Sequence, residues 1–479
     1  MSAFELDSPV TMTIDGEAVD GHGGIDVINP STGAPFAQMP AATSGQIDAA
    51  FAAADRAFTD WSADEARRRK TLLAMADAVE AATEDIVPIL TAEQGKPLHE
   101  ARREVRGAVL RLRYCGDLDI EPQVLRDDAE AQVLAVRRPL GPTAAIAPFN
   151  FPVNIGMAKV AASLRAGNTV VLKPSPYTPL STLRIGEIVR DIVPAGVLNI
   201  VSGDDGLGPM MTTHPLARVV TFTGSTGVGR LIAAAALPDF KRVSLEMGGN
   251  DPAIVLDDVD VEEVAGQLFR RAFNNNGQAC VAVKRVYVPK ALRPAMVDAL
   301  ADRARSAKVG DGFLPGVELG PLNNLMQRDR VVRLVDDAVA KGATAAAGGH
   351  RIDGPGYFYE PTILYGLSDG VEVVDEEQFG PVLPVVEYDD VEDALQRANS
   401  GKYGLGGSVW GGDLDRAAAV ARRLETGMAW VNTHTALATD FPFGGTKWSG
   451  VGVEGGRWAV EGVTDLQLIY VDKSARASS

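Results

Sequence analysis

The sequence predicts an α/β protein with a parallel sheet at its centre. Between Thr143 and Asp257, short apolar strands alternate with helical stretches, and the alternation resumes after Val261. Continuous apolar strands joined by helices are typical of parallel sheets covered on both faces, and such sheets bind ligands beyond the carboxyl ends of their strands. Six strands are expected in the first stretch, at 143–148, 169–173, 197–201, 218–222, 242–246 and 253–257.

The flanking elements follow from turn residues and periodicity. The pair Asp15-Gly16 interrupts a strand-like segment at 11–19 and favours a tight hairpin turn. Apolar residues then recur at helical spacing, which predicts a largely helical opening part: Ile47, Phe51, Ala54 and Phe58, then Leu72, Met75, Ala76 and Val79. The second α/β region is expected to hold a helix at 261–273, a strand at 283–289, a helix at 292–307 and long loops at 310–321 and 348–361.

Composition limits the class of protein. The chain has 479 residues, 46% of them hydrophobic and 23% charged, so we expect a globular protein of two or three domains. A net charge of −17 argues against nucleic acid and anionic lipid as partners. The start of the chain lacks the features of a secretory signal, and no long apolar run is present, so no membrane association is expected and the cytoplasm is the expected compartment. No metal site is expected, because the histidines lack ligand-like spacing: His22, His99, His214, His350 and His434.

Cys280 and Glu246 are the most informative pair of residues. A thiolate can attack a carbonyl carbon and become an acyl thioester, and a nearby carboxylate can activate the water that hydrolyses it. Asn275, Asn276, Gly277 and Gln278 lead into Cys280, whereas a structural cysteine is more often surrounded by apolar residues. The other cysteine, Cys115, lies in a helical segment and is interpreted as a core residue.

Two predicted strand ends carry residues that suit a phosphate or a ribose. Gly224, Gly227 and Gly229 precede an apolar helix, so backbone amides there can approach a phosphate. Their spacing differs from the GxGxxG fingerprint, and a turn without a ligand explains this loop alone equally well. Lys173 can bind ribose hydroxyls or a phosphate, and its alternative is a solvated lysine.

Two further segments are open to two interpretations each. Asn150, within PFNFP, can donate to an oxygen that gains charge during attack, or serve as a turn residue or helix cap. Glu377 and Phe379 can hold a ribose and pack beside a flat cofactor, or form part of a solvated charged run before a turn.

Seven segments, taken in order, resemble the signature series of the aldehyde dehydrogenase superfamily. They are PFNFP (148–152), VLKPS (171–175), FTGSTGVG (222–229), LEMGGNDP (245–252), NNNGQACV (274–281), EEQFGPV (376–382) and PFGGTKWSG (442–450). The resemblance implies a Rossmann-like cofactor-binding domain (1–120 and 140–247), an α/β catalytic domain (248–448), and a small β oligomerisation extension with the C-terminal segment (121–139 and 449–479). Edge strands in such an extension pair with another subunit, which implies a homodimer or homotetramer.

The resemblance also assigns catalytic roles. Cys280 is implied as the nucleophile toward a small-molecule aldehyde, with Asn150 and the Cys280 backbone N–H holding the alkoxide. Glu246 is implied as the base that activates water, and Lys159 and Glu454 as the proton relay behind it. All three central positions are intact, which favours a hydrolytic enzyme over a coenzyme A-acylating relative or a non-enzymatic binding or structural relative.

The implied cofactor is NAD or NADP. Lys173, Ser225, Glu377 and Phe379 match the family's adenosine-ribose, pyrophosphate, nicotinamide-ribose and nicotinamide contacts, and the cofactor-binding positions also include Phe149, Ser175, Pro176, Gly224 and Gly229. Many NAD-preferring members carry a glutamate where this chain has Pro176. The choice between NAD and NADP therefore stays open.

The implied substrate pocket is roomy and partly polar. Ala158 and Asn274 stand where bulky aromatics line the tunnel in familiar members, and His434, Leu437 and Asp440 lie on the loop before PFGG. No arginine occupies the site used by relatives specific for semialdehyde carboxylates. The resemblance therefore disfavours a dicarboxylic semialdehyde.

Overall fold

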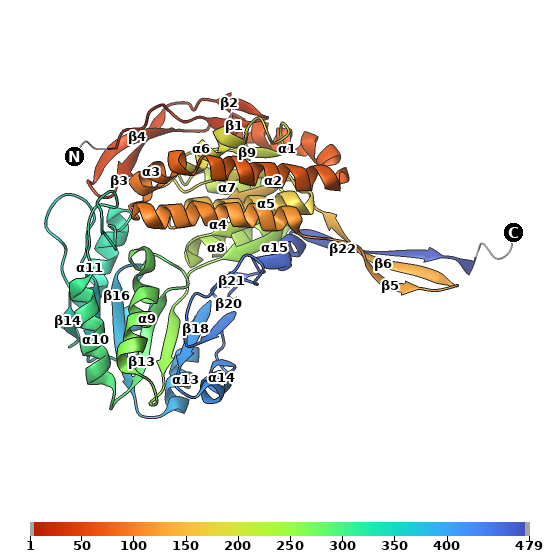
Figure 1. Cartoon of the computed structure of the whole chain (residues 1–479). Helices are drawn as coiled ribbons and strands as arrows, with labels where there is room; N and C mark the ends of the chain where they lie inside the picture. The colour runs from red at the N-terminus through yellow and green to blue at the C-terminus, as the bar shows by residue number, and fades with distance from the viewer. Residues whose placement is uncertain (1–3, 475–479) are drawn as a thin grey trace.

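The computed structural model describes residues 4–474, which form two sheet-centred parts and a projecting arm (Figure 1). The first sheet has the order β2-β1-β9-β8-β7-β10-β11-β21, and its five central strands run parallel. Its strands are β1 (Met12–Ile14), β2 (Glu17–Val19), β7 (Thr143–Ile146), β8 (Val170–Lys173), β9 (Leu198–Ile200), β10 (Val219–Thr223), β11 (Arg242–Glu246) and β21 (Gly450–Val451). Strand order reverses between β7 and β10, and this is where open α/β sheets bind ligands.

Helices cover this sheet, as the sequence predicts. They are α1 (Ser44–Ala63), α2 (Glu65–Ala81), α3 (Thr83–Gln94), α4 (Leu98–Asp117), α5 (Pro152–Ala166), α6 (Leu180–Val189), α7 (Leu207–Thr213), α8 (Thr226–Ala236) and α15 (Gly456–Gly462). α1 begins at a capping box in which Thr43 and Gln46 each accept a hydrogen bond from the other's backbone N–H. α5 begins with Pro152, whose missing N–H costs nothing there, and ends at Gly167, whose φ of 97° suits glycine.

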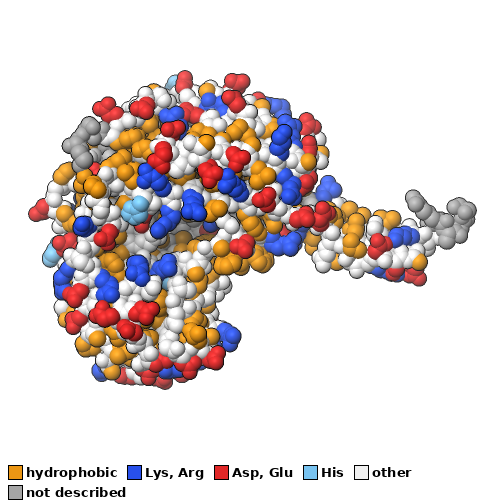
Figure 2. All heavy atoms as spheres, viewed as in Figure 1, with side chains coloured by type: hydrophobic (Ala, Val, Ile, Leu, Met, Phe, Trp, Pro, Cys, Tyr) orange, Lys and Arg blue, Asp and Glu red, His pale blue; other side chains and the backbone are white. Residues whose placement is uncertain are grey.

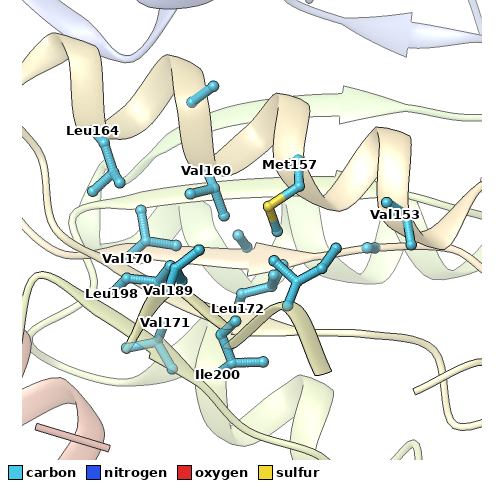
Figure 3. Packing of buried hydrophobic residues seen from close by; sticks show 14 of the residues in the cluster. Val153, Met157, Val160, Leu164, Val170, Val171, Leu172, Val189, Leu198 and Ile200 are labelled. Atoms are coloured by element: carbon cyan, nitrogen blue, oxygen red, sulfur yellow. The ribbon is translucent and has the colours of Figure 1, made fainter. Parts of the chain in front are cut away.

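The packing of α5 on the sheet fixes the turn that precedes it. Val153, Met157, Val160 and Leu164 recur at helical spacing and face β8 and β9 (Figure 3). All four are buried, and burying side chains of this size contributes about 1.5–3 kcal/mol each. The start of α5 is therefore held rigidly against the sheet.

The second sheet has the order β14-β15-β16-β13-β12-β18-β19 and is parallel except for β14. Its strands are β12 (Asp251–Val255), β13 (Val283–Pro289), β14 (Thr344–Ala347), β15 (Thr362–Tyr365), β16 (Val382–Tyr388), β18 (Gly406–Trp410) and β19 (Met428–Val431). Its helices are α9 (Val261–Phe273), α10 (Arg293–Ser306), α11 (Leu325–Ala340), α12 (Glu372–Asp375), α13 (Val391–Asn399) and α14 (Leu414–Ala421).

One expectation about the sheets was wrong. The apolar segment at 253–257 does not continue the first sheet, because it falls on β12, which pairs with β13 and β18. The chain crosses between the sheets at Gly248-Gly249. A Cβ on Gly249 would lie 2.6 Å from the Cys280 carbonyl oxygen, so only glycine allows this close crossing.

The arm consists of β5 (Gln123–Asp127), β6 (Ala131–Pro139) and β22 (Thr464–Asp472), and it projects from the body (Figure 1). β22 pairs antiparallel with β6 from Thr464 opposite Pro139 to Asp472 opposite Ala131. Two short sheets complete the fold: β3 (Gly24–Asn29) with β4 (Ala34–Pro40), and β17 (Tyr403–Gly404) with β20 (Thr446–Lys447).

The predicted hairpin at 11–19 is confirmed. Asp15 and Gly16 have φ of 56° and 80°, the left-handed pair that a two-residue turn between β1 and β2 requires. Within residues 4–474, no helix combines the length and the apolarity needed to cross a bilayer.

Candidate active site

Cys280 lies in the loop between α9 and β13, in which three consecutive residues have a left-handed backbone conformation. Asn275, Asn276 and Gly277 have φ of 49°, 55° and 73°, a conformation that asparagine tolerates better than most residues. A Cβ on Gly277 would lie 2.2 Å from the Gly380 carbonyl oxygen, so this position requires glycine. Buried amides hold the loop: Asn276 Nδ2 donates to the Gly320 carbonyl at 2.8 Å. This explains the polar run before Cys280.

Asn150 meets this loop from the other sheet. It follows β7 at the turn before α5 and is 3% exposed. Its Nδ2 donates to the Gln278 carbonyl at 3.0 Å, two residues before Cys280. In return, Asn275 Nδ2 donates to the Asn150 carbonyl at 3.0 Å. One N–H of the Asn150 amide is thus fixed by the loop, and the second is left to bind another oxygen.

A buried ion pair that the sequence reasoning missed supports Asn150 from behind. Lys96 Nζ lies 2.5 Å from Glu104 Oε2 and donates to the Asn150 carbonyl at 2.8 Å. Glu104 Oε1 accepts from the Val153 N–H at 2.9 Å, at the start of α5. Both charged side chains are at most 1% exposed, and removing one partner of such a pair costs about 3–5 kcal/mol because the other charge is left uncompensated.

Glu246 ends β11 and is 2% exposed. Neither of its carboxyl oxygens has a hydrogen-bond partner within the described part of the chain. Burial raises the pKa of Glu246, the charge of Glu454 raises it further, and Lys159 opposes both. Lys159 Nζ pairs with Glu454 Oε1 and donates to Thr221 Oγ1 at 3.0 Å.

Burial also raises the pKa of the Cys280 thiol, and the carboxylates of Glu377 and Glu246 add to this effect. The thiol is therefore protonated at rest, and it is close enough to Glu246 for the two groups to interact. Cys115 is a core residue, as expected, and burial raises the pKa of its thiol to about 12.

A cavity of about 900 Å³ lies beyond the carboxyl ends of β7, β8 and β10 and reaches Cys280. It brings together nine other predicted site residues: Phe149, Asn150, Lys173, Ser175, Pro176, Gly224, Ser225, Glu377 and Phe379. Ser225 caps α8 by accepting from the Val228 N–H at 3.3 Å, so the N-terminus of an 11-residue helix faces the cavity. A helix N-terminus favours negative charge.

Two titratable groups in the cavity wall have shifted pKa values. Burial lowers the pKa of Lys173 to about 8, although Asp205 and Asp204 oppose the shift. Burial raises the pKa of Glu377 to about 7, opposed by Lys284 and by the Gly249 N–H, which donates to Glu377 Oε1 at 3.1 Å. Phe379 has a φ of 52°, which is rare for an aromatic residue, and its ring meets the Phe149 ring edge-on at 5.7 Å.

Gly229 contributes to packing rather than to the cavity wall. A Cβ at this position would lie 2.3 Å from Met247 Sδ, so glycine lets α8 approach the segment after β11. The assignment of Gly229 to the cofactor contacts stays a prediction.

The predicted substrate residues divide into three groups. Ala158 lines a small cavity of about 30 Å³ together with Arg111, Lys159, Thr439 and Glu454. Asn274 is half-buried at the end of α9, and Leu437 and Asp440 are exposed on their loop. His434 has no exposed surface: its Nδ1 lies 2.9 Å from Ser408 Oγ and its Nε2 3.3 Å from Asp251 Oδ2. Buried in this way, His434 is out of reach of a ligand.

Among residues 4–474, no group of three or more His, Cys, Asp and Glu side chains is arranged to hold a metal ion.

Comparison with known proteins identifies the family. The model of the aldehyde dehydrogenase family matches residues 18–469. A probable succinate-semialdehyde dehydrogenase [NADP(+)] of Sinorhizobium fredii is 37% identical over 93% of this chain and 92% of its own length. A betaine aldehyde dehydrogenase of Rhizobium etli is 34% identical over 96% of each chain. The NAD+ complex of aldehyde dehydrogenase from Bacillus cereus superposes with a TM-score of 0.95 at 34% identity, covering 98% of this chain and 97% of that one. The chain therefore belongs to the aldehyde dehydrogenase family.

Proposed function

We propose that the protein oxidises an aldehyde to a free carboxylic acid with NAD+ or NADP+, through a thioester on Cys280. The observation that carries this proposal is the meeting of Cys280 and Asn150 at one cavity, close to the buried carboxyl of Glu246, which has no hydrogen-bond partner among residues 4–474. A nucleophile, an oxyanion donor and a base are the three groups that acyl chemistry of this kind needs.

The residues of the large cavity suit a dinucleotide. The N-terminus of α8 accepts a pyrophosphate, Lys173 supplies a cation for the adenosine ribose, and Glu377 accepts from the hydroxyls of the other ribose. When bound, the oxidised nicotinamide supplies the acceptor for a hydride.

The protein groups act in sequence on the substrate. The Cys280 thiol passes its proton to Glu246 and the sulfur attacks the aldehyde carbon, while the Asn150 amide and the Cys280 N–H hold the resulting alkoxide. Loss of hydride from that carbon leaves the thioester. Glu246 then takes a proton from water, the hydroxide attacks the thioester, and the acid and the free thiol are released. Lys159 and Glu454 carry the proton of Glu246 away.

Turnover assays test this function directly. Purified protein with a panel of aldehydes and NAD+ or NADP+ is expected to form reduced nicotinamide and an equal amount of free acid, without coenzyme A. Strict dependence on coenzyme A would establish the acylating alternative, and no turnover with any aldehyde would refute both.

Pro176 governs the choice of cofactor in this proposal. The Pro176→Glu variant places a carboxylate in the cavity wall beside Ser175, where it accepts from ribose hydroxyls and repels a 2′-phosphate. We expect the ratio of kcat/KM for NAD+ over NADP+ to rise about 10-fold. Pro176→Gln is the neutral control, and an unchanged ratio in the glutamate variant would show that another part of the cavity decides.

The relatives are named for aldehydes of opposite charge, so their names do not decide the charge of this protein's substrate. By name, the relatives from Sinorhizobium fredii and Escherichia coli act on succinate semialdehyde, whose far end is anionic, whereas the Rhizobium etli relative acts on betaine aldehyde, whose far end is cationic. This chain is similar to both groups at 34–37% identity.

The arm supports self-association as a homodimer or homotetramer. Alternate residues of β22 share one face of the strand, and on this face Leu466, Leu468 and Tyr470 are 63%, 62% and 56% exposed. A contiguous apolar surface of this kind is typical of a protein–protein interface. The three-part division into domains, the cytoplasmic location and the absence of nucleic acid and membrane partners stay predictions.

Changing Leu468 to Asp is expected to separate the subunits. A charge placed in an apolar interface is left unpaired, so sedimentation should show the mass falling toward the 50.5 kDa of one chain. Leu414→Asp is the matched control, because Leu414 is 62% exposed but lies on α14, away from the arm. An unchanged mass in Leu468→Asp would exclude this face of the arm as the interface.

A further inference from the structure

Arginines gather on two helices that face each other across a hollow in the body. Arg103 and Arg106 are exposed on α4, and Arg270 and Arg271 lie in the last turn of α9. We call these four residues the arginine rim. Figure 2 shows Lys and Arg side chains above and below the hollow between these helices. None of the four forms an ion pair with a carboxylate of residues 4–474. Burial lowers the pKa of Arg271, and the charges of Arg270 and Arg103 lower it further.

The nearby carboxyl groups do not neutralise the rim. Burial raises the pKa of Glu100, and Lys96, then His99 and Arg103, oppose this shift, so Glu100 is shared among several cations. Asp440 is exposed and forms no ion pair with the rim among residues 4–474. In a protein of net charge −17, such a local excess of cations attracts anions selectively.

A fifth arginine, Arg111, is more buried than the four residues of the arginine rim. Arg111 is two turns beyond Arg103 on the same face of α4, and its Nε donates to Asn154 Oδ1 at 3.0 Å. No acceptor within residues 4–474 bonds its two Nη groups. Gly107 keeps Asn154 close, since a Cβ there would lie 3.2 Å from Asn154 Oδ1.

Within residues 4–474, Arg111 has no carboxylate to itself. Burial lowers the pKa of Arg111, and Glu454 opposes this shift from across the small cavity. Glu454, however, already pairs with Lys159. Two cations therefore share one carboxylate beside Ala158, whose small side chain leaves room for the guanidinium.

Asn154 lies in the first turn of α5, four residues after Asn150, which lies in the turn before that helix. Through Asn154, the Arg111 guanidinium is held against the start of the helix that follows Asn150. Resting on the proposed function, we propose that the substrate is a short aldehyde with a carboxylate at its far end, attracted by the arginine rim and bound by Arg111.

This inference reverses the expectation from Ala158 and Asn274. Neither position carries an arginine, but the cation comes from α4 instead and occupies the space beside Ala158. Neither position carries an aromatic ring that could stack on a quaternary ammonium group.

The test compares three aldehydes of similar length on the full-length protein: 4-oxobutanoate, butanal and betaine aldehyde. We expect kcat/KM to be highest for 4-oxobutanoate. In Arg111→Met, the ratio of kcat/KM for 4-oxobutanoate over butanal should fall about 10- to 100-fold, with Arg111→Lys intermediate. Arg113→Gln, on the same helix but paired with Asp77 and Glu80, should keep the wild-type ratio.

If Arg111→Met does not fold, the salt dependence of kcat/KM, measured on the wild type and on a variant of the arginine rim, tests the inference independently. Attraction by exposed arginines is screened beyond about 8 Å at physiological salt, so kcat/KM for 4-oxobutanoate should fall as salt rises while that for butanal stays level. Arg271→Gln should flatten this dependence. Preference for butanal or betaine aldehyde, or a ratio that Arg111→Met leaves unchanged, would overturn the inference while leaving aldehyde oxidation in place. Failure to oxidise all three would overturn the proposed function as well.

Discussion

The Cys280→Ala variant is expected to lose at least about 10⁴-fold in kcat for every aldehyde, because no other group in the large cavity can form the thioester. Asn150 and the backbone amides remain in place, but they stabilise an oxyanion that no longer forms. The measurement is the rate of reduced-nicotinamide formation at saturating aldehyde and cofactor.

Cofactor binding separates loss of chemistry from loss of fold. Cys280→Ala should still bind NAD+ or NADP+ with wild-type affinity, since the proposed cofactor contacts lie on other elements. Cys115→Ala is the matched control: it removes the other thiol and should retain activity. Residual turnover within about 10-fold of wild type in Cys280→Ala would rule out Cys280 as the nucleophile.

The Glu246→Gln variant is expected to stop after the first half of the reaction. Glutamine keeps the shape of the side chain but cannot take a proton from water, so hydrolysis should slow roughly 10²- to 10⁴-fold. Stopped-flow measurement should show a burst of about one reduced nicotinamide per active site, followed by a slow steady rate.

The pH dependence of that slow step follows from the raised pKa of Glu246. Only the ionised carboxylate accepts a proton, so the wild-type hydrolysis rate should increase as pH rises toward this raised pKa and then level off. The Glu246→Gln variant should lack this rise. An undiminished steady rate in Glu246→Gln, with the wild-type pH profile, would assign the base to another group.

Local sequence patterns predicted most of the elements. Apolar runs located the five parallel strands of the first sheet, and Asp15-Gly16 located a turn, because both depend on the backbone preferences of a few neighbouring residues. Periodicity does not say which sheet a strand joins. The segment at 253–257 was therefore assigned to the wrong sheet, although Gly248-Gly249 marks the crossing.

In the site as well, local motifs could be predicted from the sequence, whereas residues brought together by tertiary packing could not. Residues within motifs, such as Cys280, Lys173 and Glu377, meet at one cavity. Lys96, Glu104 and Arg111 were missed, since charged residues are normally solvated. Glu104 and Arg111 are brought inside by the packing of α4 against α5, and Lys96, in the link between α3 and α4, is buried against Glu104. The assignment of His434 to the substrate pocket has the converse problem. A polar residue on a loop is normally exposed, but His434 is enclosed by Asp251, Ser408 and Trp430.

The most direct test of the account is the mass of Glu246→Gln after it is mixed with butanal and saturating cofactor. A thioester on Cys280 predicts that the intact chain gains the mass of a butanoyl group less one hydrogen, that the gain maps to the peptide containing Cys280, and that hydroxylamine removes it. An unmodified chain after a full burst of reduced nicotinamide, or an adduct on any other residue, would contradict it.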